Sequence, residues 1–427
     1  MTLAQRALWR NRDFRRFFAG QFVTNAGDSL YTVAILWLAF EMSGSTAVTG
    51  ALNAVLLLPW LLQVFAGPLV DRLPLRFILV GSQAAQGVVV LAVPLAAATG
   101  YLSVTVLFTV APVLMLATLL MAPMETALLP RIVDEERLSG ANSALSAVTL
   151  GFDMVFDAVG GGLIAVAGVM TLFVTDSLTF AVAALCFTGI TLQPPSEPAA
   201  DDVTGEADPT IGSVLRSYVS DLRAGIDILR GTVFVELLMT TAVANFATGV
   251  TLAILPAVGK SLGGPLVYGL LLGSLGIGRL VGSVAAPYVE GVPYGTVLLC
   301  QGLGAGCWLA AVFAPTPALT VVLFGLAWVP AGVSGVLTET LNQRVFPADL
   351  LGRVAATKGT ASGATLPLGS LVGGAVAETL GTTTTMALAA GGFGFTAVYV
   401  LLRPRLRRLP AVETAVPEDF GLEGETH

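Results

Sequence analysis

The sequence contains a single histidine, His427, which is the last of its 427 residues, and only three cysteines. Histidine is a common proton relay, haem ligand and zinc ligand, so these kinds of site are excluded from the interior of the chain. Cys186, Cys300 and Cys307 lie in apolar segments at spacings unlike those of metal ligands. We therefore expect no metal and no cofactor, and we interpret the cysteines as small core residues.

Charged residues are also scarce, at 11% of the sequence, while 55% of the residues are hydrophobic. Soluble domains contain about 25% charged residues. A soluble protein as apolar as this one would expose large hydrophobic patches. The composition therefore indicates a polytopic protein of the lipid bilayer. The net charge of −7 argues against a nucleic-acid partner.

Apolar runs of about 20 residues recur along the chain, separated by short polar breaks. They predict twelve membrane-spanning helices in two groups of six, an all-α integral membrane fold of two pseudo-symmetric six-helix bundles. The predicted helices cover residues 17–41, 46–70, 76–98, 101–124, 141–168, 170–191, 232–256, 265–289, 294–313, 318–340, 353–380 and 382–403.

The gap between the two groups differs in composition from both. Residues 193–212 are rich in Pro, Asp, Glu and Gly and indicate a linker. Residues 213–230 alternate apolar and charged positions at helical spacing, which predicts an amphipathic helix on the membrane surface. The predicted domains are a first bundle at 1–192, a cytoplasmic linker at 193–231, a second bundle at 232–403 and an acidic cytoplasmic tail at 404–427.

The basic residues predict the orientation of the chain in the membrane. If the N-terminus is inside, nearly all of the 21 Lys and Arg residues fall in inner segments. The exceptions are Lys260, in an outer segment, and Arg279 and Lys358, within predicted helices. We expect a multi-pass protein of the plasma membrane with both termini in the cytoplasm.

The two halves also resemble each other in sequence. Arg131 precedes the Gly161–Gly162 pair by 30 residues, and Arg344 precedes Gly373–Gly374 by 29. Two copies of a six-helix unit are typical of transporters that rock two halves around a central site. The alternative is a chance likeness between two glycine-rich helices.

A short motif, GPLVDRLPLRF, stands between the second and third predicted helices. It resembles the cytoplasmic signature of the major facilitator superfamily, although Pro74 occupies a position that is usually glycine. The resemblance implies that this loop is a gate that breaks and reforms during transport. The alternative is that its basic residues only set the topology. The gating residues implied by the motif are Gly67, Asp71, Arg72 and Arg76.

Two longer stretches, NRDFRRFFAGQFVTNAGDSLYTVAILWLAF and APMETALLPRIVDEERLSGANSAL, are similar to the macrolide-efflux and enterobactin-exporter-like branch of that superfamily. The resemblance covers the chain except the linker and about the last 20 residues. It implies a monomeric secondary active transporter, an exporter or antiporter for small amphipathic compounds of the drug or siderophore class. Transport would proceed by alternating access, driven by a proton or another ion. The arginine that many drug–proton antiporters carry in the fourth helix is missing.

Other functions stay open at this point. An importer or a lipid-precursor transporter would use the same fold. A non-transporting sensor or scaffold would be expected to have a large extramembrane domain, and none is indicated. A membrane-embedded enzyme would need a convergent set of nucleophile or metal ligands, so we expect no enzyme. No Walker A sequence suggests the use of ATP.

Charged side chains within the predicted helices are candidates for function, because each costs about 2.5–3.5 kcal/mol to insert at the centre of a helix. We assign substrate or ion coupling to Asp28, Asp153, Asp157, Arg279 and Lys358. Asp176 lies on a helix expected to be a support, so we interpret it as a structural hydrogen-bonding residue. For Lys358 the alternative is that the side chain snorkels to the inner surface.

The stretch GFDMVFDAVGGG places Asp153 and Asp157 four residues apart, on one face of a helix. Exporters of the superfamily often have glycines at these two positions. Two close carboxyl groups in a low-dielectric cavity repel each other, so one is expected to keep a proton. Such a group can load and release a proton during transport. The alternative is that both only line a water-filled vestibule.

Overall fold

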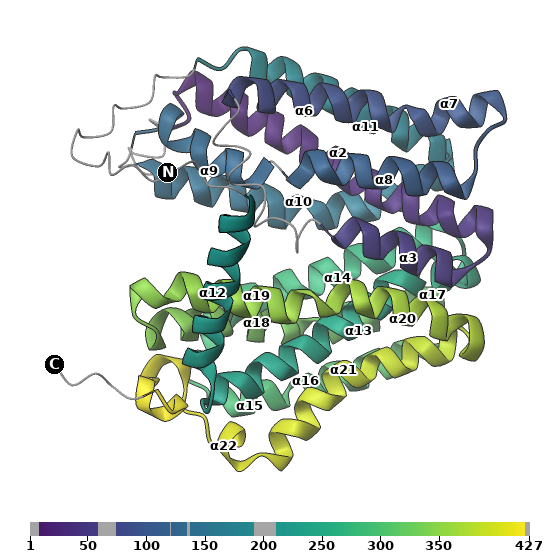
Figure 1. Ribbon diagram of the computed structural model, residues 1–427. Coiled ribbons are helices and arrows are strands. Elements are labelled where there is room, and N and C mark those ends of the chain that lie inside the picture. Colours follow the sequence, from purple (N-terminus) through teal and green to yellow (C-terminus); the bar gives the residue numbers. More distant parts are fainter. Residues whose placement is uncertain (1–7, 59–73, 120, 135–136, 192–210, 423–427) are drawn as a thin grey trace. The chain divides into compact units, whose positions relative to one another are not determined.

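The computed structural model describes residues 8–58, 74–119, 121–134, 137–191 and 211–422. In these ranges the regular secondary structure is helical, apart from one isolated bridge between Pro293 and Ala411 (Figure 1). The all-α class expected from the apolar runs is therefore confirmed.

The first half of the chain forms α2 (Arg12–Ser43), α3 (Thr46–Leu57), α6 (Leu75–Val90), α7 (Ala92–Thr99), α8 (Val104–Leu119), α9 (Met121–Ile132), α10 (Leu138–Ala167) and α11 (Val169–Thr188). The amphipathic stretch between the halves forms α12 (Ile211–Leu229).

The second half forms α13 (Val233–Leu262), α14 (Pro265–Ala285), α15 (Tyr294–Leu299), α16 (Gln301–Val312), α17 (Pro317–Ala327), α18 (Val329–Val345), α19 (Ala348–Gly363), α20 (Thr365–Leu380) and α21 (Thr382–Leu402). Short turns of helix follow as η3 (Ala286–Val289), α22 (Pro404–Arg407), η4 (Val412–Thr414) and η5 (Pro417–Phe420).

Seven helical segments of the described ranges are long and apolar enough to cross a membrane, and three shorter apolar helices accompany them. Several predicted spans consist of two helices joined end to end, such as α15 with α16 and α17 with α18. The total of twelve spans stays a prediction.

The internal repeat is visible in the turns that follow two corresponding helices. Gly168 ends α10 with φ 81° and ψ 157°, and Gly381 ends α20 with φ 81° and ψ 156°. The Gly168 N–H donates to the Ile164 carbonyl, and the Gly381 N–H donates to the Ala377 carbonyl, both at 3.0 Å. Side chains rarely adopt this positive φ, so glycine is required at both turns. The same geometry follows the corresponding glycines Gly161 and Gly373 by seven and eight residues, which supports a duplicated unit.

The chain divides into two compact units. One comprises residues 1–35 and 58–218, and the other comprises residues 36–57 and 219–427. In the first unit α6 packs along α11, and in the second α13 packs along α20 and α21. Helix α3 belongs to the second unit, where it packs on α20 and α13 (Figure 1).

The segment after α21 is folded against the second unit. Phe420 is fully buried, and its ring stacks on that of Phe234 at a centroid distance of 5.3 Å. The Arg344 side chain donates to the Glu413 carbonyl at 2.8 Å, and the Tyr294 N–H donates to the Pro410 carbonyl at 2.9 Å. This part of the predicted acidic tail is therefore an ordered piece of the second unit.

Candidate functional site

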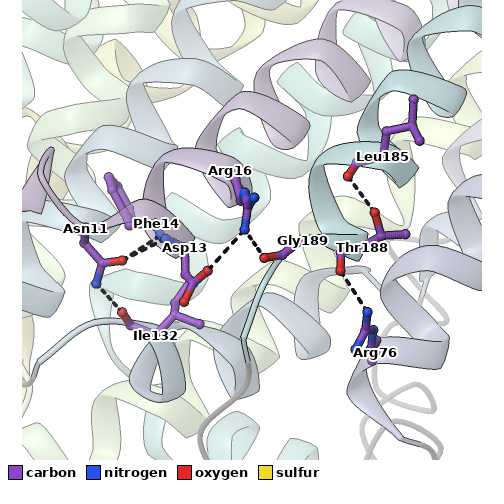
Figure 2. Close-up of polar contacts among 9 residues, drawn as sticks. All are labelled: Asn11, Asp13, Phe14, Arg16, Arg76, Ile132, Leu185, Thr188 and Gly189. Atoms are coloured by element: carbon purple, nitrogen blue, oxygen red, sulfur yellow. Dashed lines mark hydrogen bonds and ion pairs between the residues drawn. The ribbon is translucent and has the colours of Figure 1, made fainter.

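Most of the predicted gating loop, including Gly67, Asp71 and Arg72, lies outside the described residues. Arg76 is described in the first turn of α6, where it is exposed and donates through Nη2 to the Thr188 carbonyl at 2.8 Å (Figure 2). Thr188 is the last residue of α11, so its carbonyl has no partner within the helix. A cation here also complements the negative end of the helix dipole.

A second arginine binds at the same end of α11. Arg16 donates to the Gly189 carbonyl, and its guanidinium lies 3.9 Å from the Asp13 carboxylate (Figure 2). Asn11 caps the start of α2 through hydrogen bonds to the N–H groups of Asp13 and Phe14, and its amide donates to the Ile132 carbonyl at 2.6 Å. These contacts tie the predicted cytoplasmic ends of α2, α6, α9 and α11 together.

The acidic candidates of the first unit lie on two helices. Asp28 is half-buried on α2, and Asp157 is half-buried on α10. The side chain of Asp153 lies outside the described residues. The coupling roles of these three residues stay predictions.

Asp176 on α11 is a residue whose environment the sequence prediction missed. Its side chain is 0% exposed, and it is close enough to Asp28 for the two to interact electrostatically. Thr179 donates to its Oδ1 at 3.3 Å, whereas its Oδ2 has no hydrogen-bond partner in the part of the chain that the structure describes. The signal in the sequence is Gly27, which precedes Asp28 and allows α2 to approach α11 closely.

The two basic candidates of the second unit have different environments. The Lys358 ammonium donates to Asn342 Oδ1 at 2.6 Å and lies 4.8 Å from the centroid of the Phe234 ring. It therefore has partners inside the unit, one of them a cation–π contact.

Arg279 is exposed on α14. Beside it, Gly278 and Gly282 face the backbone of α17 and α18 so closely that a Cβ at either position would collide with a carbonyl oxygen. Within the described residues its guanidinium forms no salt bridge. The acidic or substrate partner expected for Arg279 stays a prediction.

Comparison with known proteins identifies the family. A family model described as "transmembrane secretion effector", of the MFS type, matches residues 4–421. This chain belongs to the transmembrane secretion effector family. It is thus a membrane transporter of the major facilitator superfamily, and the members of that superfamily are not enzymes.

Individual relatives of this transmembrane secretion effector are distant. The uncharacterized MFS-type transporter YvqJ of Bacillus subtilis (strain 168) is 23% identical over 383 residues, 88% of each chain. The nucleoside transporter NupG has a TM-score of 0.67 at 12% identity and covers 91% of this chain and 98% of its own. A bacterial homologue of the human lysosomal transporter Spinster has a TM-score of 0.66 at 12% identity, covering 97% and 98%. At these identities the structures show a shared fold alone.

One feature of the transporter's second unit lies at the predicted outer end, where α3 meets α20. The Glu378 carboxylate accepts hydrogen bonds from Ser45 Oγ at 2.6 Å, from the Ala47 N–H at 3.2 Å and from Thr46 Oγ1 at 3.4 Å. Glu378 thereby caps the N-terminus of a helix from the other half of the sequence, where a carboxylate also meets the positive end of the helix dipole.

The rest of the α3–α20 contact is close-packed. Thr46 Oγ1 donates to the Gly374 carbonyl at 2.8 Å, and Asn53 Nδ2 donates to Ser370 Oγ at 2.8 Å. A Cβ on Gly50 or on Gly374 would collide with the backbone of the facing helix. Small residues here let the two backbones approach, as is common where helices pack in membranes.

Proposed function

We propose that the protein is an exporter of small amphipathic compounds, of the drug or siderophore class, driven by an ion gradient. The observation that carries this proposal is the match of residues 4–421 to a secretion family, which favours movement out of the cell over uptake. The resemblance of the sequence to the macrolide-efflux and enterobactin-exporter-like branch supports the same direction. A monomer in the plasma membrane with both termini in the cytoplasm is part of the proposal.

The mechanism that we propose is alternating access between two bundles, residues 1–192 and 232–403, joined by the cytoplasmic linker at 193–231. Helix α3 is part of the bundle 1–192 by sequence but packs on α20 within the second unit, and we propose that this contact, capped by Glu378, closes the outer side of the substrate path. The loop with Asp71, Arg72 and Arg76 closes the inner side in the opposite state. Only one of the two closures forms at a time, so the substrate is exposed to one side of the membrane.

The candidate coupling residues divide by charge between the halves. Asp28, Asp153 and Asp157 supply acidic groups in the first half, and Arg279 and Lys358 supply basic groups in the second. We assign proton loading to the acids and attraction of a polar or anionic part of the substrate to the bases. Lys358 is held in place for this role by Asn342 and Phe234.

Everted membrane vesicles from cells that produce the protein test this proposal. Vesicles energised to be acidic inside are given a panel of dyes, macrolides and siderophores one at a time. The proposal expects at least one compound to accumulate inside the vesicles, and a protonophore to abolish its accumulation. The Asp71→Asn variant, produced to the same level, is the matched control and should accumulate much less.

Two other results would overturn the proposal. The same panel, extended to nucleosides and lipid precursors, is also given to right-side-out vesicles. Accumulation in these vesicles and not in everted ones would make the protein an importer. Accumulation that survives the protonophore and persists without any ion gradient would remove ion coupling.

A further inference from the structure

Two acidic side chains on different helices of the first unit form a pair, of which the proposed mechanism uses only Asp28. Gly27, the residue before Asp28 on α2, lies so close to α11 that a Cβ there would collide with Asp176 Oδ1. Asp28, Asp176 and the Tyr31 hydroxyl are thereby near enough to interact electrostatically. Asp176 is 0% exposed and Tyr31 is 4% exposed, whereas Asp28 is half-buried. One member of the pair is thus sealed inside the unit and the other lies nearer its surface.

The buried end of this pair has hydrogen-bonding capacity that no described residue meets. Asp176 Oδ2 and the Tyr31 hydroxyl both lack a partner in the described ranges, and Asp176 Oδ1 accepts a long hydrogen bond of 3.3 Å from Thr179. Buried polar groups are almost always paired, so Asp176 Oδ2 is expected to carry a proton or to bind another ligand. An enclosed carboxylate without a counter-charge is also very costly.

The charged groups on the neighbouring helices do not supply that counter-charge. Helices α6, α7 and α10 pack against α11, and so does α2 at Gly27. The basic residue of α2 nearest to Asp28 in sequence is Arg16, about 18 Å away along the helix. Arg76, the one basic residue of α6, is bound to the Thr188 carbonyl, about 18 Å along α11 from Asp176. Helix α7 carries no charged residue, and the charged residues of α10 are the acids Asp153 and Asp157.

The packing around the pair favours a proton over a metal ion. A Cβ at Gly27 would collide with both Thr179 Oγ1 and Asp176 Oδ1, so α2 and α11 leave little space here. Mg²⁺ and Ca²⁺ take six or more oxygen ligands. The described residues contain no group of three or more His, Cys, Asp or Glu placed to hold a metal ion. A proton needs no such space and is readily shared by two close carboxyl groups.

We propose that Asp28 and Asp176 form a proton-binding pair, in which Asp176 holds the proton and Asp28 exchanges it with water. The inference rests on the proposed ion-driven transport and names the group that carries the ion. In the loaded state one O–H bond lies within the pair and the net charge is −1. When the proton leaves to water by way of Asp28, the charge becomes −2. That state is stable only when water reaches the pair, which links release to a conformational change.

The direct test is infrared spectroscopy of the purified full-length protein in lipid nanodiscs, titrated from about pH 5 to about pH 9. Aspartate labelled with ¹³C separates the carbonyl band of protonated aspartate from that of protonated glutamate. The measurement uses a background with Asp153→Asn and Asp157→Asn, because one of these two aspartates is also expected to keep a proton. This protein should show a protonated aspartate at neutral pH, and adding Asp176→Asn should remove it. Asp28→Asn should still show the band at low pH. The band should disappear at a pH about one unit lower than with Asp28 present, because the repelling charge of Asp28 is gone.

The matched control is Asp134→Asn, which removes an exposed carboxylate that pairs with Arg137 at 2.9 Å and should leave the band unchanged. If Asp176→Asn does not fold, the shift in Asp28→Asn decides the matter. The pair is refuted if the background protein has no protonated aspartate at neutral pH, or if adding Asp28→Asn leaves the titration unmoved. Stoichiometric metal in the wild type that Asp176→Asn lacks would also overturn it.

These readouts need no transported compound. Failure of the vesicle assay would therefore remove the proposed function, whereas failure of the infrared titration would remove only the proton-binding pair.

Discussion

The contact between Glu378 and the start of α3 yields the sharpest prediction about the transport cycle. Glu378→Ala removes the acceptor of hydrogen bonds from Ser45 Oγ, Thr46 Oγ1 and the Ala47 N–H. If these bonds hold the outer side closed, their loss shifts the protein toward the outward-open state without unfolding it.

The size of this shift follows from the geometry. Loss of a helix N-cap costs about 1 kcal/mol, in a range of about 0.5–2 kcal/mol. The interaction of a carboxylate with the helix dipole contributes about 0.3–1 kcal/mol, and an exposed carboxylate such as Glu378 lies near the low end. Ser45 Oγ still accepts from the Val48 N–H, and Thr46 still donates to the Gly374 carbonyl, so the contact is weakened and not lost. A change of about 1 kcal/mol moves the ratio of the two states about fivefold.

Electron paramagnetic resonance distance measurements can resolve a change of that size. Spin labels at two exposed positions of the predicted outer end, Tyr101 in the first unit and Thr383 in the second, report the populations of the two states. The three native cysteines are first replaced by serine. Glu378→Ala should raise the ratio of the long-distance to the short-distance population about fivefold. Glu378→Gln, which keeps an acceptor, should raise this ratio less.

Thr379→Ala serves as the matched control, since its hydroxyl bonds to the Val376 carbonyl of its own helix at 2.9 Å. It should leave the distances as in the wild type. An unchanged distribution in Glu378→Ala, with the protein folded, would refute the closing role of this contact.

Four further variants test other parts of the account. Asp71→Asn should slow transport strongly at normal expression, measured in the vesicle assay; unchanged transport would reduce the motif to a topology signal. Arg279→Leu should impair transport, and full activity would place its side chain at lipid or headgroups. The double variant Asp153→Asn, Asp157→Asn should uncouple transport from the pH gradient but still bind substrate, as measured by calorimetry. If it still accumulates substrate, neither aspartate is the coupling site. Phe420→Ala removes a fully buried ring and should lower the unfolding free energy by about 3–5 kcal/mol, measured by thermal denaturation. An unchanged melting temperature would show that the tail adds no stability.

The helices of this fold are largely predictable from the sequence, because each long apolar run must satisfy its backbone hydrogen bonds internally in lipid. The run predicted at 382–403 is observed as Thr382–Leu402, and that predicted at 141–168 as Leu138–Ala167. Interruptions within a span, such as the one between α15 and α16, are not marked by any loss of hydrophobicity and were not predicted.

The surroundings of the charged residues were harder to predict. The sequence indicates which residues are charged and apolar, but not which helix lies against them. The sequence predicts a structural hydrogen-bonding role for Asp176, and its proximity to Asp28 follows only once Gly27 brings α2 against α11. The docking of Phe420 on Phe234 was also missed, since a short segment with several prolines has no helical period to reveal a buried face.

Coupling of export to an ion gradient can be measured in proteoliposomes that contain only the purified protein. A substrate found in the vesicle panel is added without any imposed gradient, and a pH-sensitive dye trapped inside follows proton movement. The account predicts that substrate movement in one direction drives protons in the other, in the wild type and not in Asp28→Asn. Substrate that crosses the membrane while the internal pH stays constant in the wild type would contradict it.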